Sequence, residues 1–239
     1  MARRKGCALA GGDVLVCLDA HMSFGRDWLD RMLAHVESRA LLCSAFWDYE
    51  RHACHCFGAD FEWCAQRDYG AQRYPGFRLR HRQRLPRRGA VEVSMAIGAC
   101  YMLLRSSYET LGGFCPLFRV WGIDEQDLSA RAWMAGLGVK CVADACVGHL
   151  WRAAFPYPVC FEHLEFNQLA SIRSVFDESS VAMLEAFFAP LPPLVRAWLD
   201  AIDVSPWRDV VQGARQFEDR DFFARFVPEL HRLREQLAD

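Results

Sequence analysis

Lysine is almost missing from this 239-residue chain, which contains only Lys5 and Lys140. Nearly all of the positive charge is therefore arginine, and the formal net charge at pH 7 is −2. This balance provides no overall attraction to nucleic acid or to an anionic membrane surface, so we expect neither as a partner. The arginine bias indicates a GC-rich genome, although arginine also suits phosphate recognition.

Long apolar runs are also missing. The longest run, Met95 to Leu104, is far shorter than the ~20 residues that span a bilayer, so we expect no transmembrane segment. The N-terminal Arg-Arg-Lys is followed at once by Gly6 and Cys7, without the apolar core of a secretory signal. The 11 cysteines are irregularly spaced. We therefore expect reduced, mostly buried thiols in a cytoplasmic, bacterial protein.

What is present is the composition of an ordinary globular protein, with 52% apolar and 24% charged residues. Apolar runs over residues 13–18, 40–47, 99–104 and 140–147 predict strands, and amphipathic periodicity predicts helices over 26–37 and 124–135. Residues 78–88 read as a basic loop broken by Pro86. Beyond Pro158 the pattern predicts only helices, over 162–176, 180–188, 193–201 and 219–237. The chain is therefore predicted to be an α/β part, 1–155, followed by a helical extension, 156–239.

Two segments 128 residues apart could form one metal site. The first ends an apolar strand in Asp19-Ala20-His21, and the second ends another strand in Gly148-His149. One carboxylate and two imidazoles at strand ends form a mixed oxygen and nitrogen ligand set, which suits a hard-to-borderline divalent ion. Each segment alone has a simpler interpretation, because aspartate often ends a strand as a turn residue and a lone histidine is commonly a core residue.

These segments belong to a longer series of motifs that resembles the catalytic domain of GT-A glycosyltransferases of family 2. The similarity is greatest to polypeptide N-acetylgalactosaminyltransferases, in which Asp-x-His replaces the usual Asp-x-Asp. The motifs keep the order and approximate spacing of that family over roughly residues 5–155. They are Gly11–His21, Gly58–Trp63, Met95–Ala99, Leu111–Phe114, Trp121–Trp133 and Val147–Arg152.

The resemblance implies a GT-A fold, a mixed sheet flanked by helices, and a metal-dependent transfer reaction. A hexose or N-acetylhexosamine would move from a UDP-sugar to a hydroxyl of a glycan, a lipid-linked sugar or a protein. Asp19, His21 and His149 would hold Mn²⁺, with Mg²⁺ as the alternative. The ion would act as a Lewis acid on the diphosphate leaving group.

The resemblance also implies roles for acidic residues at the start of the predicted helix over 124–135. Asp124 takes the position of an acidic residue that contacts the transferred sugar, and Glu125 takes that of the catalytic base of related inverting enzymes. Both could instead be carboxylates that favour a helix N-terminus, and the two interpretations are compatible. Ile123 stands where the family has glycine, and Glu125 where relatives carry Asn or Asp. These differences leave the sugar and the stereochemical course open.

Four further positions complete the predicted substrate site. Trp121 and Gly122 would shape the donor and acceptor pocket, and Arg152 would lie over the diphosphate. Gly98 would let the backbone approach the sugar closely. The simpler interpretations are a strand bulge at Gly98 and a surface arginine at Arg152.

The resemblance does not include the first strands of GT-A domains, which bind the nucleotide base, because the chain starts just before the metal motif. We therefore expect an N-terminally truncated sheet with an exposed edge through which chains associate. A catalytically inactive fragment or relic acting as an interaction module is the alternative function. A second alternative is a zinc-stabilised nucleic-acid binder built on His52–Cys56 and Cys64, although the Cys-x-Cys spacing lacks the usual two-residue gap.

Overall fold

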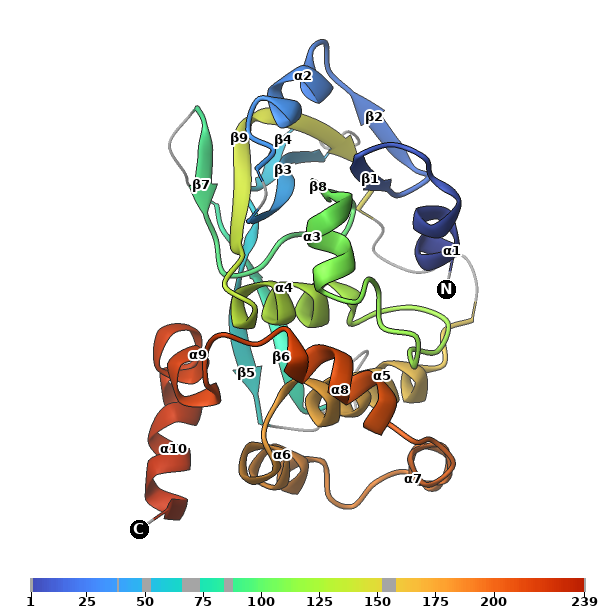
Figure 1. Ribbon diagram of the computed structural model, residues 1–239, viewed down its shortest axis with the longest axis vertical. Helices are drawn as coiled ribbons and strands as arrows, with labels where there is room; N and C mark the ends of the chain where they lie inside the picture. Colours follow the sequence, from blue (N-terminus) through green and yellow to red (C-terminus); the bar gives the residue numbers. More distant parts are fainter. Residues whose placement is uncertain are drawn as a thin grey trace.

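The computed structural model describes residues 2–37, 39–48, 53–65, 74–83, 88–151 and 158–238. A mixed sheet occupies one end of the molecule and a group of helices the other, with helix α4 (Asp124–Met134) between them (Figure 1). The fold is α/β, as predicted. The division at residue 155 stays a prediction.

The main sheet has the strand order β1-β8-β3-β9-β2, with β4 paired to β3 and β7 paired to β9. Strands β3 and β9 are parallel neighbours, and the other pairs are antiparallel. Burial of the central strand β3 on both faces explains its nearly continuous apolar sequence. The strands are β1 (Val14–Leu18), β2 (Met22–Phe24), β3 (Ala40–Asp48), β4 (Ala53–Cys56), β7 (Ala90–Glu92), β8 (Cys100–Leu104) and β9 (Gly138–His149).

Strand β1 forms one edge of this sheet, with no strand on its outer side among the residues that the structure describes. Val16 and Leu18 on this strand are 36% and 38% exposed, whereas Leu15 and Cys17 face the core. This edge strand, with its exposed aliphatic side chains, agrees with the exposed sheet edge that the sequence predicts. Association of chains through it stays a prediction.

The predicted basic loop over residues 78–88 is wrong in its first part. Gly76–His81 is strand β6, which pairs antiparallel with β5 (Ala59–Cys64) as a separate two-stranded sheet. Arg78 and Arg80 alternate with apolar residues along β6, so that Phe77 reaches the core while the arginines lie on the other face. The prediction of a loop rested on the charge of residues 78–88. It did not take into account that polar and apolar side chains alternate here, as they do in a strand.

The helices agree with the predicted positions more closely than with the predicted lengths. The predicted helix over 26–37 is shorter, and that over 219–237 is two helices, because Pro228 has no N–H to continue the first. Three helices were not predicted, α1, α3 and α8. The helices other than α4 are α1 (Ala2–Leu9), α2 (Trp28–Leu33), α3 (Arg105–Thr110), α5 (Phe161–Val175), α6 (Glu178–Glu185), α7 (Pro193–Asp200), α8 (Ser205–Gly213), α9 (Asp219–Phe226) and α10 (Pro228–Ala238), with a 3₁₀ turn at Ala186–Phe188.

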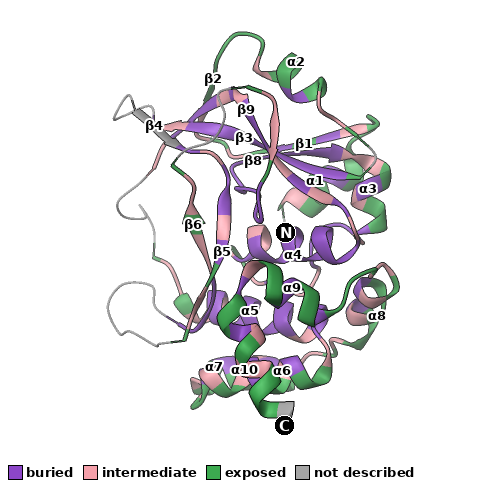
Figure 2. Cartoon of the chain, turned by 90° about the vertical axis from the view of Figure 1, so that its left-hand side faces the viewer, coloured by how far each residue is buried: buried purple, intermediate pink, exposed green. Residues whose placement is uncertain are grey.

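One hydrophobic cluster extends from the sheet into the helical end. It includes Phe46 on β3, Trp133 on α4, Phe166 on α5 and Phe222 on α9, all of them buried. Figure 2 shows buried residues concentrated in β3, β8, β9, α4 and α5, with exposed residues on the outer helices. Helix α4 therefore has its acidic N-terminus held between the sheet and helix α5.

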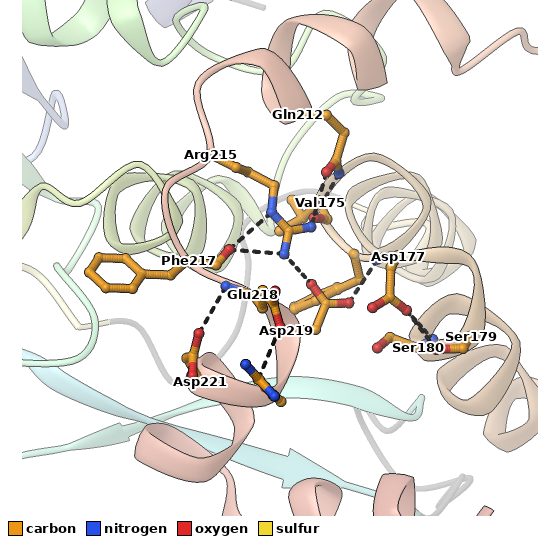
Figure 3. A network of polar contacts seen from close by, with 12 residues as sticks. Val175, Asp177, Ser179, Ser180, Gln212, Arg215, Phe217, Glu218, Asp219 and Asp221 are labelled. Carbon is orange, nitrogen blue, oxygen red and sulfur yellow. Dashed lines mark hydrogen bonds and ion pairs between the residues drawn. The ribbon is translucent and has the colours of Figure 1, made fainter. Parts of the chain in front are cut away.

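A polar network around Arg215 fixes the C-terminal helices to α5 (Figure 3). Its guanidinium donates to the carbonyl oxygens of Val175 and Phe217 and to Asp219 Oδ1 at 2.6 Å. Asp219 is fully buried and also accepts a hydrogen bond from the backbone N–H of Asp177. These bonds join α5, α8 and α9, so helices after residue 158 support the same core as the sheet.

Candidate active site

Three predicted metal ligands meet at one end of the sheet. Asp19 follows β1, His21 precedes β2, and His149 ends β9, which pairs with β2 through the Met22 and His149 register. One ligand atom from each of Asp19, His21 and His149 lies within 4.8 Å of the others. Among the described residues, no other group of three or more His, Cys, Asp or Glu side chains is close enough to hold an ion.

His149 is the residue that most clearly suits a cation. It is 8% exposed, and neither of its ring nitrogens makes a hydrogen bond to any residue that the structure describes. Buried polar atoms normally have a partner, so two orphaned nitrogens indicate a missing ligand. Nε2 lies 3.5 Å from Asp19 Oδ2, which is too long for a good hydrogen bond but leaves room for a shared ion. The donor set therefore fits a divalent metal.

Asp19 presents its other carboxylate oxygen to Arg3 on α1. Arg3 Nη2 donates to Asp19 Oδ1 at 2.6 Å and to the carbonyl oxygen of Gly98 at 2.7 Å, while Nη1 donates to Asp124 Oδ2. Burial acts to raise the pKa of Asp19, but contacts with His149 and Arg3 outweigh it and hold that pKa below its usual value. Because Oδ2 remains directed to His149, the Arg3 ion pair and metal binding are compatible.

Arg3 was missed in the sequence, where the N-terminal Arg-Arg-Lys was read only for its charge. The helix that carries it was not predicted, and the pattern of residues 2–9 gives little evidence of a buried face, since only Cys7 is buried. Only the packing of α1 beside β1 shows that Arg3 connects Asp19 with Asp124.

Glu125 lies against the backbone of Gly98, whose N–H donates to Glu125 Oε1 at 2.8 Å. A Cβ at position 98 would lie 2.6 Å from this carboxylate, so only glycine allows the approach. Removal of the carboxyl from solvent, together with the charge of Asp124, raises the pKa of Glu125 to about 7. The Gly98 hydrogen bond and Arg3 act in the opposite direction. A carboxyl with this pKa can accept a proton near neutral pH.

The backbone before α4 is strained. Val120 and Ile123 have φ values of 47° and 72°, in the left-handed region that β-branched residues rarely adopt, and Gly122 has 92°. A Cβ at position 122 would lie 2.0 Å from Leu164 Cδ2, so glycine is required there too. Trp121, between them, is 50% exposed. A strained loop that displays an aromatic side chain beside acidic residues is typical of a functional site.

Asn167 on α5 holds this loop. Its Nδ2 donates to the carbonyl oxygens of Arg119, Trp121 and Gly122 at 2.9, 3.1 and 3.2 Å, and its Oδ1 accepts from Arg119 N–H at 2.7 Å. Asn167 is fully buried. No sequence signal identified it, because one polar residue in an otherwise apolar helix face does not reveal its partner.

These residues surround a cavity of about 210 Å³. The predicted residues that line it are Asp19, Trp121, Gly122 and Asp124, and Gly98 and Glu125 lie directly beside Asp124 and Arg3. Its full lining is Ala2, Arg3, Asp19, Phe114, Cys115, Phe118, Val120, Trp121, Gly122 and Asp124. The structure thus brings Asp124 and one metal ligand, Asp19, into one depression, with Glu125 next to Asp124 in the chain.

The structure does not describe the side chains that two predicted features depend on. Arg152 is one, so its role at a diphosphate stays a prediction. The other is most of the His52–Cys56 cluster, since only the side chain of Cys56 is described, and that residue is buried in the core. All ten cysteines with described side chains are free thiols, and most of them are buried.

Two family descriptions match this region. Residues 1–112 match the glycosyl transferase family 2 description, and residues 87–150 match the N-terminal domain of galactosyltransferase. A solved structure of GalNAc-T7 with UDP, GalNAc and Mn²⁺ superposes with a TM-score of 0.72 and 16% identity. The match covers 96% of this chain and 43% of that one. The chain thus has the GT-A type of fold, and its residues 1–112 resemble family 2 glycosyltransferases.

The related sequences include several N-acetylgalactosaminyltransferases from animals. "Probable N-acetylgalactosaminyltransferase 6" of Caenorhabditis elegans is 27% identical over 166 residues, and "N-acetylgalactosaminyltransferase 7" of Drosophila melanogaster is 27% identical over 228 residues. These matches cover 65% and 85% of this chain but only 26% and 36% of the relatives. The GT-A chain thus spans roughly a quarter to a third of their length. In the part that the structure describes, no helix is both long and apolar enough to cross a bilayer.

Proposed function

We propose that this GT-A chain is a metal-dependent glycosyltransferase that moves a hexose or an N-acetylhexosamine from a UDP-sugar to a hydroxyl acceptor. The single observation that carries the proposal is that Asp19, His21 and His149 lie together. The buried imidazole of His149 has two ring nitrogens without a partner among the described residues. The GalNAc-T7 structure, whose fold this chain shares, is described with UDP, GalNAc and Mn²⁺, which supports the donor and metal classes.

In this proposal Asp19, His21 and His149 hold Mn²⁺, with Mg²⁺ as the alternative. Two imidazoles in the set favour the softer ion, because Mg²⁺ prefers oxygen ligands. When bound, such an ion supplies Lewis-acid stabilisation of the negative charge that grows on the departing diphosphate. Arg152 is proposed to add a fixed positive charge at the same phosphates.

The remaining residues orient the sugar and the acceptor. Asp124 is proposed to accept hydrogen bonds from hydroxyls of the donor sugar, and Arg3 holds its carboxylate in place. Glu125, with a pKa raised to about 7, is proposed to take the proton of the acceptor hydroxyl in an inverting reaction. Trp121 and Gly122 form the wall of the pocket, and Gly98 fixes the Glu125 carboxylate through its N–H.

Calorimetric titration of UDP in the presence of Mn²⁺, and again in EDTA, tests the proposal. We expect binding that requires the ion, followed by UDP release when a suitable UDP-sugar is supplied. Absence of UDP binding by a folded sample would contradict the proposal and favour the alternative of an inactive interaction module. A cytoplasmic location and a bacterial source stay predictions, since the matched relatives are animal proteins.

A further inference from the structure

A second cavity adjoins the candidate active site across Val120. It measures about 360 Å³, and a smaller cavity of about 150 Å³ shares lining residues with both. Val120 lines all three cavities, Trp121 lines the first and the smaller one, and His163 lines the smaller and the larger one. A groove therefore leads from the Asp19 and Asp124 pocket, over the strained loop, to the space between α5 and α7.

Arg119 provides the charge in this second cavity. Its guanidinium lies 4.3 Å from the ring centroid of Trp198 and 5.0 Å from that of Phe166. Its Nε is buried and makes no hydrogen bond within the described part of the chain. Among the residues that the structure describes, Arg119 has no acidic partner within ion-pair distance. A buried Nε donor without a partner is unusual, because buried donors are normally satisfied.

The walls of the cavity lack acidic groups. They are apolar apart from Arg119 and His163, whose ring stacks on Trp198 with centroids 5.0 Å apart. The lining consists of Leu117, Phe118, Arg119, Val120, His163, Phe166 and Ile202. Two side chains that can carry positive charge thus face one space with no carboxylate in its lining.

We propose that this cavity binds the anionic group of the acceptor, and that the acceptor is a sugar carrying a carboxylate or a phosphate. The planar guanidinium of Arg119 suits bidentate hydrogen bonding to either group, and the aromatic stacking holds its plane in place. The apolar walls and Trp121 contact the sugar ring. This inference rests on the proposed transferase function and names its acceptor class.

The size of the cavity favours a small charged sugar over a larger partner. Its volume lies near the lower end of the ~300–1,000 Å³ that is usual for small-ligand sites. The groove reaches the pocket lined by Asp19 and Asp124, so an acceptor anchored at Arg119 can present a neighbouring hydroxyl there. The anionic group of the acceptor therefore binds at a site separate from the one proposed for the donor diphosphate.

Calorimetry with methyl β-D-glucuronide, glucose 6-phosphate and neutral methyl β-D-glucoside tests the inference on the full chain in the presence of UDP and Mn²⁺. We expect a charged sugar to bind about 10-fold or more tightly than the neutral one, and Arg119→Gln to remove this difference. Arg196→Gln on α7 is the matched control, because Arg196 is an exposed arginine with no ion pair among the described residues, and it should leave the preference unchanged. The two charged probes distinguish a carboxylate from a phosphate acceptor.

Equal binding of charged and neutral sugars, or a preference that survives Arg119→Gln, would overturn the inference. Binding of an acidic peptide in place of every sugar, dependent on Arg119, would also overturn it and assign the groove to a peptide acceptor. Salt provides a test without mutation, since a screened charge interaction should lose the preference as ionic strength rises. Arg119→Lys keeps the positive charge but lacks the planar set of N–H donors of a guanidinium. It should therefore give an intermediate preference for charged over neutral sugars.

The same titrations separate this inference from the proposed function. UDP binding with Mn²⁺ should be the same in Arg119→Gln as in the unmodified chain. If UDP fails to bind while the Arg119-dependent preference persists, the transferase proposal fails and the anion site stands. If UDP binds and no anion preference exists, the transferase proposal stands and this inference fails.

Discussion

The side-chain amide of Asn167 donates a hydrogen bond to the carbonyl oxygen of Trp121 at 3.1 Å, across 46 residues of sequence. This bond is one of four that Asn167 makes to the loop before α4. The helix that carries Asn167 lies in the C-terminal part, whereas the loop leads to Asp124 and Glu125. The helical part therefore shapes the candidate active site directly.

Replacing Asn167 by Leu should release the loop and leave its carbonyl groups buried without partners. Unpaired buried polar groups cost ~1–3 kcal/mol each, so we expect a loss of about 2–4 kcal/mol in the free energy of unfolding. UDP-sugar turnover should fall more than donor affinity, because the loop orients groups for the reaction. Chemical denaturation and steady-state kinetics measure the two effects. Ser174→Ala is the control, since the Ser174 hydroxyl donates to the Ala170 carbonyl oxygen within the same helix. Equal loss of turnover in both variants would contradict a positioning role.

Replacing His149 by Ala should weaken Mn²⁺ binding. Changes to groups that merely support metal ligands cost ~10–100-fold in affinity, and loss of a ligand should cost at least as much. Competition with a fluorescent chelator measures the dissociation constant. His35→Ala removes an imidazole away from the site and should leave Mn²⁺ affinity unchanged. Unaltered affinity in His149→Ala would exclude the Asp19, His21 and His149 site.

The raised pKa of Glu125 predicts how activity depends on pH. A base must be deprotonated, so turnover should rise with pH through a limb near pH 7, and Glu125→Gln should lose that limb. Turnover profiles between pH 5 and 9, at about unit intervals or finer, provide the measurement. A limb that persists in the variant would assign the titration to another group.

The same shift predicts a dependence of stability on pH in metal-free protein. Because the folded state raises the pKa of Glu125 from 4.5 to about 7, protonated Glu125 contributes stability that is complete below pH ~4.5. That contribution is lost as pH rises through about 7. Melting temperatures in EDTA should therefore fall less steeply over this range in Glu125→Gln than in the unmodified chain.

Replacing Arg3 by Gln should move the activity limb to higher pH. Arg3 lowers the pKa of Glu125, so its removal raises that pKa further. The change also frees Asp124 and Asp19 from their shared cation. Arg4→Gln removes an exposed arginine from the same helix and should leave the profile in place. A profile that Arg3→Gln does not shift would show that α1 does not influence the acidic pair.

Replacing Asp127 by Ala should destabilise the fold severely. Its carboxylate accepts hydrogen bonds from Arg131 at 2.6 and 2.9 Å and from Ser171 at 2.9 Å, and both charged residues are at most 2% exposed. The variant leaves Arg131 buried without an anion, a change that costs ~3–5 kcal/mol. Arg220→Ala breaks an exposed pair with Glu218 and should cost about 1 kcal/mol or less. Denaturant titration compares the two.

The residues that sequence reasoning located best are those whose role depends on local pattern. Continuous apolar runs identified β1, β3, β8 and β9 to within about two residues, because buried strands of a covered sheet need such runs. The Arg78 and Arg80 strand was misread since charge concealed its alternation. The prediction of Asp19, His21 and His149 as a group combined strand ends with a family resemblance, and the structure places them together.

The sequence by itself determined the α/β class, the positions of the main strands and helices, and the ligand types at the strand ends, because backbone preference and burial periodicity are local. Only the tertiary structure decided that Arg3 joins Asp19 to Asp124, that Asn167 holds the strained loop, and that Arg119 packs on the aromatic rings of Phe166 and Trp198. Each is a contact between segments far apart in sequence. Its energy depends on distance and burial, which no local pattern records.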